Sequence, residues 1–307
     1  HVADGQAVLY QFPSLAPFFF FFSTYINETA MKAALGPEFH IPSDYFANLE
    51  VRKAFAYAFN YTHYVDVLQG NQKYGMDFGD GYAGVIVPGL AYHVPESQLQ
   101  NVPTYNVTYA KELLQKSGEY NVSINIPIVL FTGDAVDYSA AQMWGAAMNS
   151  IDPNIVMTPM YLPAPIMNTL YTLPCPMPIF IGLWTGDYPY ASDYVDNMYK
   201  EGVGYAWDWS VDYLNSTGHP DQASIFAHMN SLIVEADSTT NVTLAAQDYK
   251  QIEQLAISLY MYVYLSVPKS FWLVKPYISG YQGQISYQMN PIVGAAGIGL
   301  YYWWVKG

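Results

Sequence analysis

Residues 122–160 carry a strand–helix–strand pattern, and this pattern restricts the possible folds more than any other feature of the sequence. Apolar side chains alternate along 122–131, which is the spacing of a β-strand. An apolar stripe at helical spacing follows over about 138–151, and a second apolar strand covers about 155–160. Two strands joined through one helix predict a parallel pair within an α/β domain.

Further predicted elements extend this unit toward both ends of the chain. Residues 7–26 have extended character and are interrupted by Pro13 and Pro17, which predicts short separate strands. Asn48 precedes an apolar stripe at helical spacing and is predicted to cap a helix. The other predictions are a helix over about 107–116 that stops at Gly118, a strand over 179–184, helices over about 221–236 and 243–260, alternating strands and turns over 263–305, and a long loop over 70–104. Residues 163–178 are rich in proline.

The composition excludes several classes of protein. The chain carries 11 Lys and Arg against 25 Asp and Glu, a formal net charge of −14 at pH 7. This balance disfavours binding to nucleic acid or to an anionic membrane surface, because both would repel it. Hydrophobic residues make up 52% and charged residues 12%, which predicts a buried core rather than disorder. No apolar run is long enough for a membrane span.

Motifs of common catalytic and metal sites are missing from the sequence. It contains no G-x-S-x-G, no Walker A motif and no H-E-x-x-H. The single cysteine, Cys175, lies between two prolines and excludes an intramolecular disulfide and a cysteine-based zinc cluster. We therefore predict no catalytic activity, no metal site and no cofactor.

Two features predict an extracellular protein. The chain has 30 Tyr and few Lys, a surface chemistry that suits an acidic or hot exterior, although a lineage bias explains it equally well. It also has more N-x-S/T sequons than its composition predicts by chance, which favours a secreted glycoprotein. The predicted glycosylation sites are Asn27, Asn60, Asn106, Asn121, Asn215 and Asn241.

One acidic residue is the strongest candidate for a ligand contact. Asp187 follows the predicted strand 179–184 and Trp184, within an aromatic stretch. A carboxylate at a strand end inside an aromatic cleft is a suitable partner for an ammonium group. The alternative is an ordinary solvated loop aspartate.

Four blocks resemble the solute-binding proteins of ABC transporters of the peptide/nickel-binding type, known as family 5. They are NLEVRKAFAYAFN at 48–60, YNVTYAKELLQKSG at 105–118, LWTGDYP at 183–189 and VKPYISGY at 274–281. They occur in the order that the family shows and span most of the chain. The sequence is therefore identified as an archaeal-like, extracellular member of this family.

The resemblance implies a type II periplasmic-binding-protein fold, in which two α/β lobes are joined by a hinge. Family members are about twice as long, so this chain corresponds to the C-terminal half. Residues 1–27 would be strands of a first lobe that is largely missing, 28–265 the ligand-binding lobe, and 266–307 the return to the first lobe. Because the chain begins with His1, we expect a fragment or a processed product. An N-terminal segment or a second chain would complete the first lobe.

The resemblance also implies a function, namely capture of oligopeptides by hinge closure and delivery to a permease–ATPase complex. Asp187 would bind the α-ammonium of the peptide, Trp184 and Tyr188 would line the pocket, and Gly186 would allow close backbone approach. Arg52 would be structural. The protein would lie at the cell surface, secreted or held by an anchor outside this sequence.

Two other functions are compatible with the same sequence. The family often has Asp-Pro shortly after the third block, and Tyr190-Ala191 stands there in this chain. This difference leaves open an oligosaccharide-binding member, because an aromatic-rich cleft suits sugar stacking. A structural cell-surface glycoprotein that reuses the fold is the second alternative.

Overall fold

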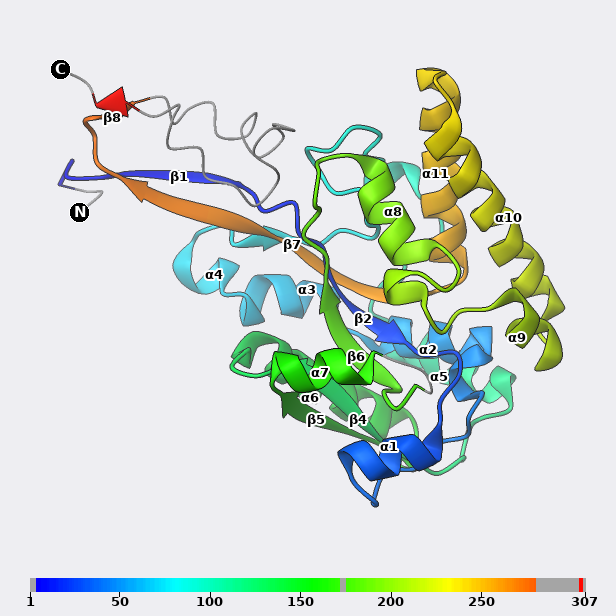
Figure 1. Cartoon of the computed structure of the whole chain (residues 1–307). Helices are drawn as coiled ribbons and strands as arrows, with labels where there is room; N and C mark the ends of the chain where they lie inside the picture. Colours follow the sequence, from blue (N-terminus) through cyan, green and yellow to red (C-terminus); the bar gives the residue numbers. More distant parts are fainter. Residues whose placement is uncertain (1–3, 172–174, 280–303, 306–307) are drawn as a thin grey trace.

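One mixed β-sheet organises the protein. The computed structural model describes residues 4–171, 175–279 and 304–305. Its main sheet has the strand order β1-β7-β2-β6-β4-β5, and β3 pairs with β7 outside this path (Figure 1). The strands are β1 Val8–Pro13, β2 Phe18–Phe22, β3 Gly79–Asp80, β4 Ile124–Phe131, β5 Ile155–Leu162, β6 Ile179–Leu183 and β7 Tyr262–Val274, with a separate pair of β8 Ile278–Ser279 and β9 Trp304–Val305.

The predicted strand–helix–strand unit is confirmed. Strands β4 and β5 pair in parallel from Ile124 opposite Ile155 onward, and helix α6 (Ala135–Ile151) connects them. The helix begins three residues before the predicted start. The reason is a cap at Asp134, whose carboxylate accepts the backbone amides of the first helical turn at 3.1 Å. Strand β4 also pairs in parallel with β6, so three strands run in the same direction.

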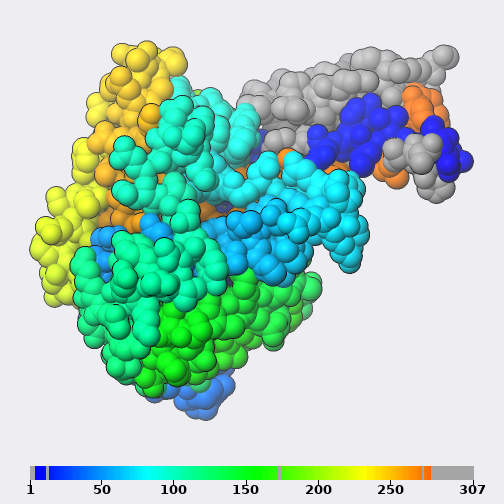
Figure 2. Space-filling view, turned by 180° about the vertical axis from the view of Figure 1, so that it is seen from behind, coloured from blue at the N-terminus to red at the C-terminus, as the bar shows by residue number. Residues whose placement is uncertain are grey.

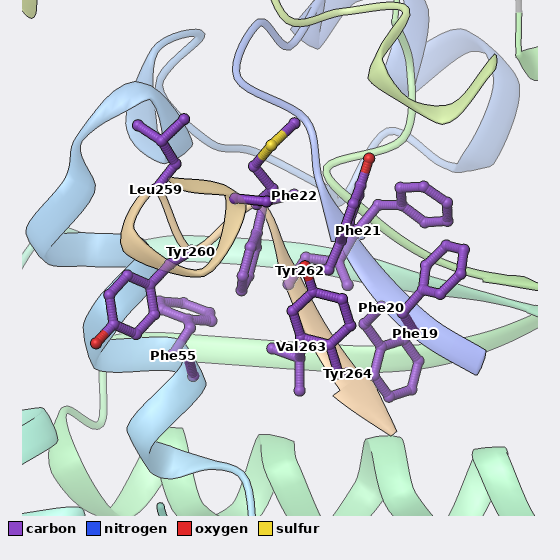
Figure 3. Close-up of a cluster of buried hydrophobic side chains, with 14 of the residues drawn as sticks. Phe19, Phe20, Phe21, Phe22, Phe55, Leu259, Tyr260, Tyr262, Val263 and Tyr264 are labelled. Atoms are coloured by element: carbon purple, nitrogen blue, oxygen red, sulfur yellow. The ribbon is translucent and has the colours of Figure 1, made fainter. Parts of the chain in front are cut away.

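The phenylalanine run forms the central strand. Strand β2 lies between β6 and β7, antiparallel to both, and Phe19 to Phe22 are at most 1% exposed. Figure 3 shows these rings beside the tyrosines of β7. Phe21 stacks on Phe180 at a centroid distance of 4.3 Å, and Phe20 packs on Trp144 at 5.3 Å. A strand buried on both faces needs such a continuous apolar run instead of an alternating pattern.

The predicted helices are confirmed where capping and apolar spacing agree. Asn48 caps α2 by accepting the amide of Glu50 at 3.1 Å, and Gly118 ends α5 with a φ of +86°. Helices α10 and α11 pack side by side at one end of the molecule (Figure 1). Helix α6 packs against β4 and β5. The helices besides α6 are α1 Glu28–Leu35, α2 Leu49–Ala58, α3 Tyr61–His63, α4 Asn71–Tyr74, α5 Val107–Ser117, α7 Ala164–Leu170, α8 Ala191–Tyr199, α9 Val211–Ser216, α10 Pro220–Ser238 and α11 Val242–Ser258, with 3-10 turns at Tyr45–Ala47, Glu96–Gln98 and Gly204–Ala206 and a π-helical turn at Tyr64–Leu68.

Two segments rich in Gly or Pro contain regular structure. The proline-rich segment 163–178 holds helix α7, because Pro163 and Pro165 stand at its start, where the missing amide hydrogen costs no helical hydrogen bond. The segment 70–104 contains α4, β3 and a 3-10 turn. The prediction of a loop over the whole of 70–104 was therefore wrong.

The predicted alternation of strands and turns over 263–305 agrees with the structure where residues are described, since a turn at Pro276 follows β7 and precedes β8. Strand β7 is one continuous strand of 13 residues, because its first part pairs with β2 and its second part with β1. Predictions for 280–303 and 306–307 lie outside the described residues.

Strand β1 and the second half of β7 form a two-stranded ribbon that projects from the body (Figures 1 and 2). Leu9 on β1 is 39% exposed and Leu273 on β7 is 60% exposed. Within the predicted 1–27 segment, β1 thus belongs to the ribbon, whereas β2 is central in the main sheet. The sheet runs across both predicted boundaries, at residues 27 and 265, and the division there stays a prediction.

None of the helices in the described part of the chain combines the length and the apolar character required to cross a lipid bilayer.

Candidate ligand-binding site

The predicted ligand loop lies at the carboxyl edge of the parallel strands. Because β4, β5 and β6 are parallel, their carboxyl ends meet at one edge of the sheet. Asp134 follows β4 there, and the loop 184–190 follows β6. Strand β7 runs in the same direction as β6 and continues past this edge into the ribbon. Open α/β sheets bind ligands outside the carboxyl ends of their strands, so this edge is the candidate site.

The loop exposes two of the three side chains predicted to contact a ligand. Asp187 is exposed to solvent, and Tyr188 is 45% exposed with its hydroxyl 3.1 Å from that of Ser192. Trp184 is half-buried, and its backbone amide donates to the carbonyl of Pro17 at 3.3 Å. The loop is therefore attached to the link between β1 and β2, where the ribbon leaves the body.

A carboxylate that the sequence analysis did not single out lies under this loop. Asp193, in the first turn of α8, is 4% exposed. Its Oδ2 accepts the backbone amide of Asp187 at 2.7 Å and the indole Nε1–H of Trp184 at 3.3 Å. Desolvation raises the pKa of this carboxyl, and the hydrogen bonds that it accepts oppose the rise. An acidic residue in the first turn of a helix was the only available signal.

Gly186 packs closely against the chain's own helix α8. A Cβ atom at this position would lie 2.6 Å from Oδ2 of Asp193 and 2.8 Å from the ring of Tyr194. The close approach that requires glycine is thus to the chain's own helix α8. The predicted close approach to a ligand remains a prediction.

Aromatic side chains from several segments lie beside the loop. Trp184 lies edge-on to Tyr205 at a centroid distance of 6.3 Å. The hydroxyl of Tyr190 donates to that of Tyr92 at 3.3 Å, and Tyr92 packs on Tyr249 at 5.1 Å. These rings come from segments far apart in the sequence, so only the fold brings them together.

A pocket of about 190 Å³ lies at the same edge, beside the base of the ribbon. It is lined by residues that include Phe18, Tyr64, Asp134 and Asp137. Asp137 is 2% exposed and accepts the hydroxyl hydrogen of Tyr64 at 2.9 Å. Desolvation, followed by the neighbouring charge of Asp134, raises the pKa of Asp137 to about 8. At neutral pH this carboxyl is therefore largely protonated.

A second pocket, of about 220 Å³, lies away from this loop. Its lining includes Tyr61, Tyr82, Glu96, Tyr105 and Tyr264. None of the four predicted ligand-binding residues contributes to it.

Among the described residues, no three His, Cys, Asp or Glu side chains are placed to hold a metal ion. Cys175 is buried, with its Sγ 3.1 Å from the hydroxyl oxygen of Ser23. Burial raises the pKa of this thiol, which disfavours the reactive thiolate.

Arg52 is structural in this fold. Its guanidinium is fully buried and lies 4.7 Å from the ring centre of Trp209. It donates to the carbonyl oxygens of Ala47 and Leu259 at 2.8–3.0 Å and to Oε1 of Gln222 at 2.6 Å. These bonds connect the start of α2 to the end of α11, which agrees with the structural role expected from the sequence.

The predicted glycosylation sites fall into two groups. In the first group the asparagine Oδ1 caps a helix by accepting backbone amides, and helix capping is an independent reason for asparagine there. In the second group the asparagine is exposed and caps no helix. Glycan attachment stays a prediction at every site. The first group is Asn27, Asn60, Asn106 and Asn241, and the second is Asn121 and Asn215.

A comparison with family models identifies the chain. The model of bacterial extracellular solute-binding proteins, family 5, middle region, matches residues 2–206, about two thirds of the sequence. The chain belongs to this family. A search among curated proteins finds no match.

Solved structures confirm the predicted fold class. A putative peptide binding protein AppA from Clostridium difficile superposes with a TM-score of 0.68 at 16% identity. The oligopeptide-binding protein AppA from Bacillus subtilis, in complex with a nonapeptide, gives 0.64 at 14% identity. OppA from Haemophilus influenzae, in complex with RPPGFSPFR, gives 0.63 at 16% identity. The type II periplasmic-binding-protein lobe is thereby confirmed.

The family-5 chain spans about half the length of these proteins. The matches cover 98%, 98% and 97% of this chain, but only 53%, 53% and 50% of the three relatives. The prediction that the sequence corresponds to one half of a family member agrees with these shares.

Proposed function

We propose that this chain is the ligand-binding half of an extracellular solute-binding protein that captures oligopeptides for an ABC importer without catalysis. The observation that carries the proposal is the position of the loop 184–190. It presents Asp187 at the carboxyl edge of the sheet, where the ribbon leaves the body. Relatives of the same fold are described with a nonapeptide and with the peptide RPPGFSPFR bound, which supports a peptide ligand.

In the proposed binding mode the carboxylate of Asp187 pairs with the α-ammonium of the peptide. Trp184 and Tyr188 line the same pocket. Closure of a first lobe over this edge desolvates the pair and strengthens it, because attraction between charges grows as water is excluded. Ligand contacts to both lobes then favour the closed form, and the ribbon of β1 and β7 serves as part of the hinge.

The proposal includes the parts that this chain does not contain. An N-terminal segment or a second chain supplies the first lobe, and the closed protein docks on a membrane permease with its ATPase. The protein acts outside the cell, at the cell surface, and carries glycans on at least some of its sequons.

Calorimetry with a peptide and its N-acetylated form tests the role of Asp187. The chain is used together with the segment or chain that supplies the first lobe. We expect Asp187→Asn to weaken binding of the free-amine peptide about a hundredfold, or about 3 kcal/mol. N-acetylation removes the ammonium charge, so it should weaken binding to the wild type by a similar factor. It should leave binding to the variant unaffected, because the variant has no carboxylate at this position with which the ammonium could pair.

Asp212→Asn is the matched control, since Asp212 is an exposed carboxylate on α9. It should bind as the wild type does. Equal affinity of the wild type for the free and the acetylated peptide would contradict the role proposed for Asp187.

An oligosaccharide ligand is the second candidate, favoured by an aromatic pair at the same edge. Tyr138 and Tyr161 lie 4.9 Å apart with an interplanar angle of 31°, and Tyr161 is 37% exposed. An exposed ring of this kind suits stacking against a sugar. This function predicts oligosaccharide binding that Tyr161→Ala abolishes and that Asp187→Asn leaves intact.

A further inference from the structure

We infer that Asp193 is a positioning residue, which holds the loop 184–188 in the conformation that presents Asp187 to a ligand ammonium group. The inference rests on the proposed function for its ligand and on the described contacts for its geometry. Asp193 itself lies under the loop and faces the protein interior, being 4% exposed.

The first argument is that one carboxylate oxygen binds two separate points of the loop. Oδ2 of Asp193 accepts the amide of Asp187 at 2.7 Å and the indole N–H of Trp184 at 3.3 Å. The backbone of Asp187 and the side chain of Trp184 are thereby fixed relative to each other. Hydrogen bonds to an ionised acceptor are about twice as strong as neutral ones, so this carboxylate is a strong anchor for the loop.

The second argument is that Asp193 is itself fixed. Its backbone amide donates to the carbonyl of Tyr190 at 3.2 Å, and its carbonyl accepts Nδ2 of Asn197 at 2.7 Å. The next residue, Tyr194, is fully buried and donates its hydroxyl to the carbonyl of Leu15 at 2.8 Å. The first turn of α8 thus contacts the ligand loop and the β1–β2 link together.

The third argument concerns the space between the loop and the helix. Gly186 leaves no room for a side chain, because an added Cβ would lie 2.6 Å from Oδ2 of Asp193. The loop therefore packs directly on the carboxylate, and a displacement of one requires a displacement of the other.

The charges also point to a cationic ligand group. Asp187 and Asp193 lie in one loop–helix unit, and the charge of Asp187 is one of the factors, after desolvation, that raise the pKa of Asp193. A ligand ammonium bound at Asp187 relieves this repulsion, whereas a neutral group does not. The pair therefore adds selectivity for a cation, and Asp193 contributes to it without touching the ligand.

Hydrogen exchange of the loop measures positioning without any ligand. Mass spectrometry of the full chain would compare peptides that cover 184–190 in the wild type, Asp193→Ala, Asp193→Asn and Asp196→Asn. We expect loop exchange about tenfold faster in Asp193→Ala. Asp193→Asn should recover part of the protection, since an amide oxygen still accepts a hydrogen bond. Asp196, one turn further along α8 and paired with Lys200, is the matched control and should leave the loop unchanged.

A substitution from the loop side gives an independent test. Gly186→Ala should speed loop exchange in the wild type, because the new methyl group meets the Asp193 carboxylate. Its effect should be smaller in the Asp193→Ala background, where that oxygen is absent. Fully additive effects would overturn the direct packing on which the inference depends.

Peptide affinity then separates a positioning role from a purely structural one. Asp193→Ala should weaken peptide binding about tenfold at a temperature where the variant is folded, and Asp193→Asn should weaken it less. Faster loop exchange with unchanged peptide affinity would overturn the inference, as would unchanged exchange. If the wild type binds no free-amine peptide, the proposed function fails, and the exchange experiments still decide whether Asp193 holds the loop.

Discussion

Buried carboxylates are the residues whose protonation makes the stability of this protein depend on pH. Glu253 on α11 is completely buried and accepts the backbone amides of Val85 and Ile86 at 2.7–3.0 Å and the hydroxyl hydrogen of Tyr199 at 3.1 Å. Burial raises its pKa to about 7, because desolvation outweighs these bonds. The same cause raises the pKa of Asp208 to about 7.

The sign of the resulting pH dependence follows from proton counting. Between the ordinary carboxyl pKa and about 7, the folded state binds a proton at each site that the unfolded state has lost. The free energy of unfolding therefore falls as pH rises through this window, and is larger at pH 4 than at pH 7.5. This direction agrees with the acidic exterior considered from the composition.

Glu253→Gln tests this prediction. We expect the wild type to lose about 3 kcal/mol between pH 4 and pH 7.5 from Glu253, and the variant to lose correspondingly less. Urea unfolding across this pH range measures both. Glu235→Gln, an exposed glutamate on α10, is the control. Identical pH profiles for the wild type and Glu253→Gln would show that this carboxyl does not titrate as its burial requires.

At the scale of elements, helix caps connect local sequence to packing. Asn48 accepts the amide of Glu50 at 3.1 Å and donates through Nδ2 to the carbonyl of Ser117 at 3.1 Å. One side chain thus caps the start of α2 and donates a hydrogen bond to a carbonyl at the end of α5. The two helices pack against each other, so the asparagine stabilises a local boundary and a tertiary contact together.

Asn48→Ala should lower the free energy of unfolding by about 1–2 kcal/mol, since both bonds are lost. Asn48→Asp keeps the cap and loses only the donor, so it should cost less. Chemical denaturation at constant pH would measure the two variants. A stability of Asn48→Ala equal to that of the wild type would show that water replaces both bonds without loss.

At the scale of the whole molecule, the ribbon is the feature that we propose joins this chain to a first lobe. It projects from the carboxyl edge of the sheet, beside the candidate ligand loop (Figure 1). Leu9 and Leu273 on its two strands remain exposed. A first lobe that joins this ribbon would face the edge that carries Asp187, which is the arrangement that hinge closure requires.

Small-angle scattering tests closure on the protein with both lobes present. A saturating peptide should reduce the radius of gyration in the wild type, because ligand contacts favour the closed form. Asp187→Asn at the same peptide concentration should stay open. A radius of gyration unaffected by a peptide that demonstrably binds would contradict hinge closure.

The sequence allowed prediction of the elements whose signals are local. The strand at 122–131, the helix capped by Asn48, the helix at about 107–116 and the fold class all followed from apolar spacing, caps and family blocks, and the structure confirms them. Helix α7 was not predicted, because prolines occur both in loops and at the starts of helices. The length of β7 was not predicted either, because the point at which a strand changes its pairing partner is not visible in its own sequence.

In the candidate site, too, some features follow from the sequence and others only from the tertiary structure. By itself the sequence determined that Trp184 ends an apolar strand and that Gly186, Asp187 and Tyr188 follow it directly, because neighbours in sequence need no fold to meet. Only the tertiary structure decided that Asp193 anchors this loop, that Gly186 packs on it, and that the β1–β2 link lies alongside. These contacts depend on which surfaces the sheet brings together, and a buried hydrogen bond leaves no periodic pattern in the sequence from which it could be predicted.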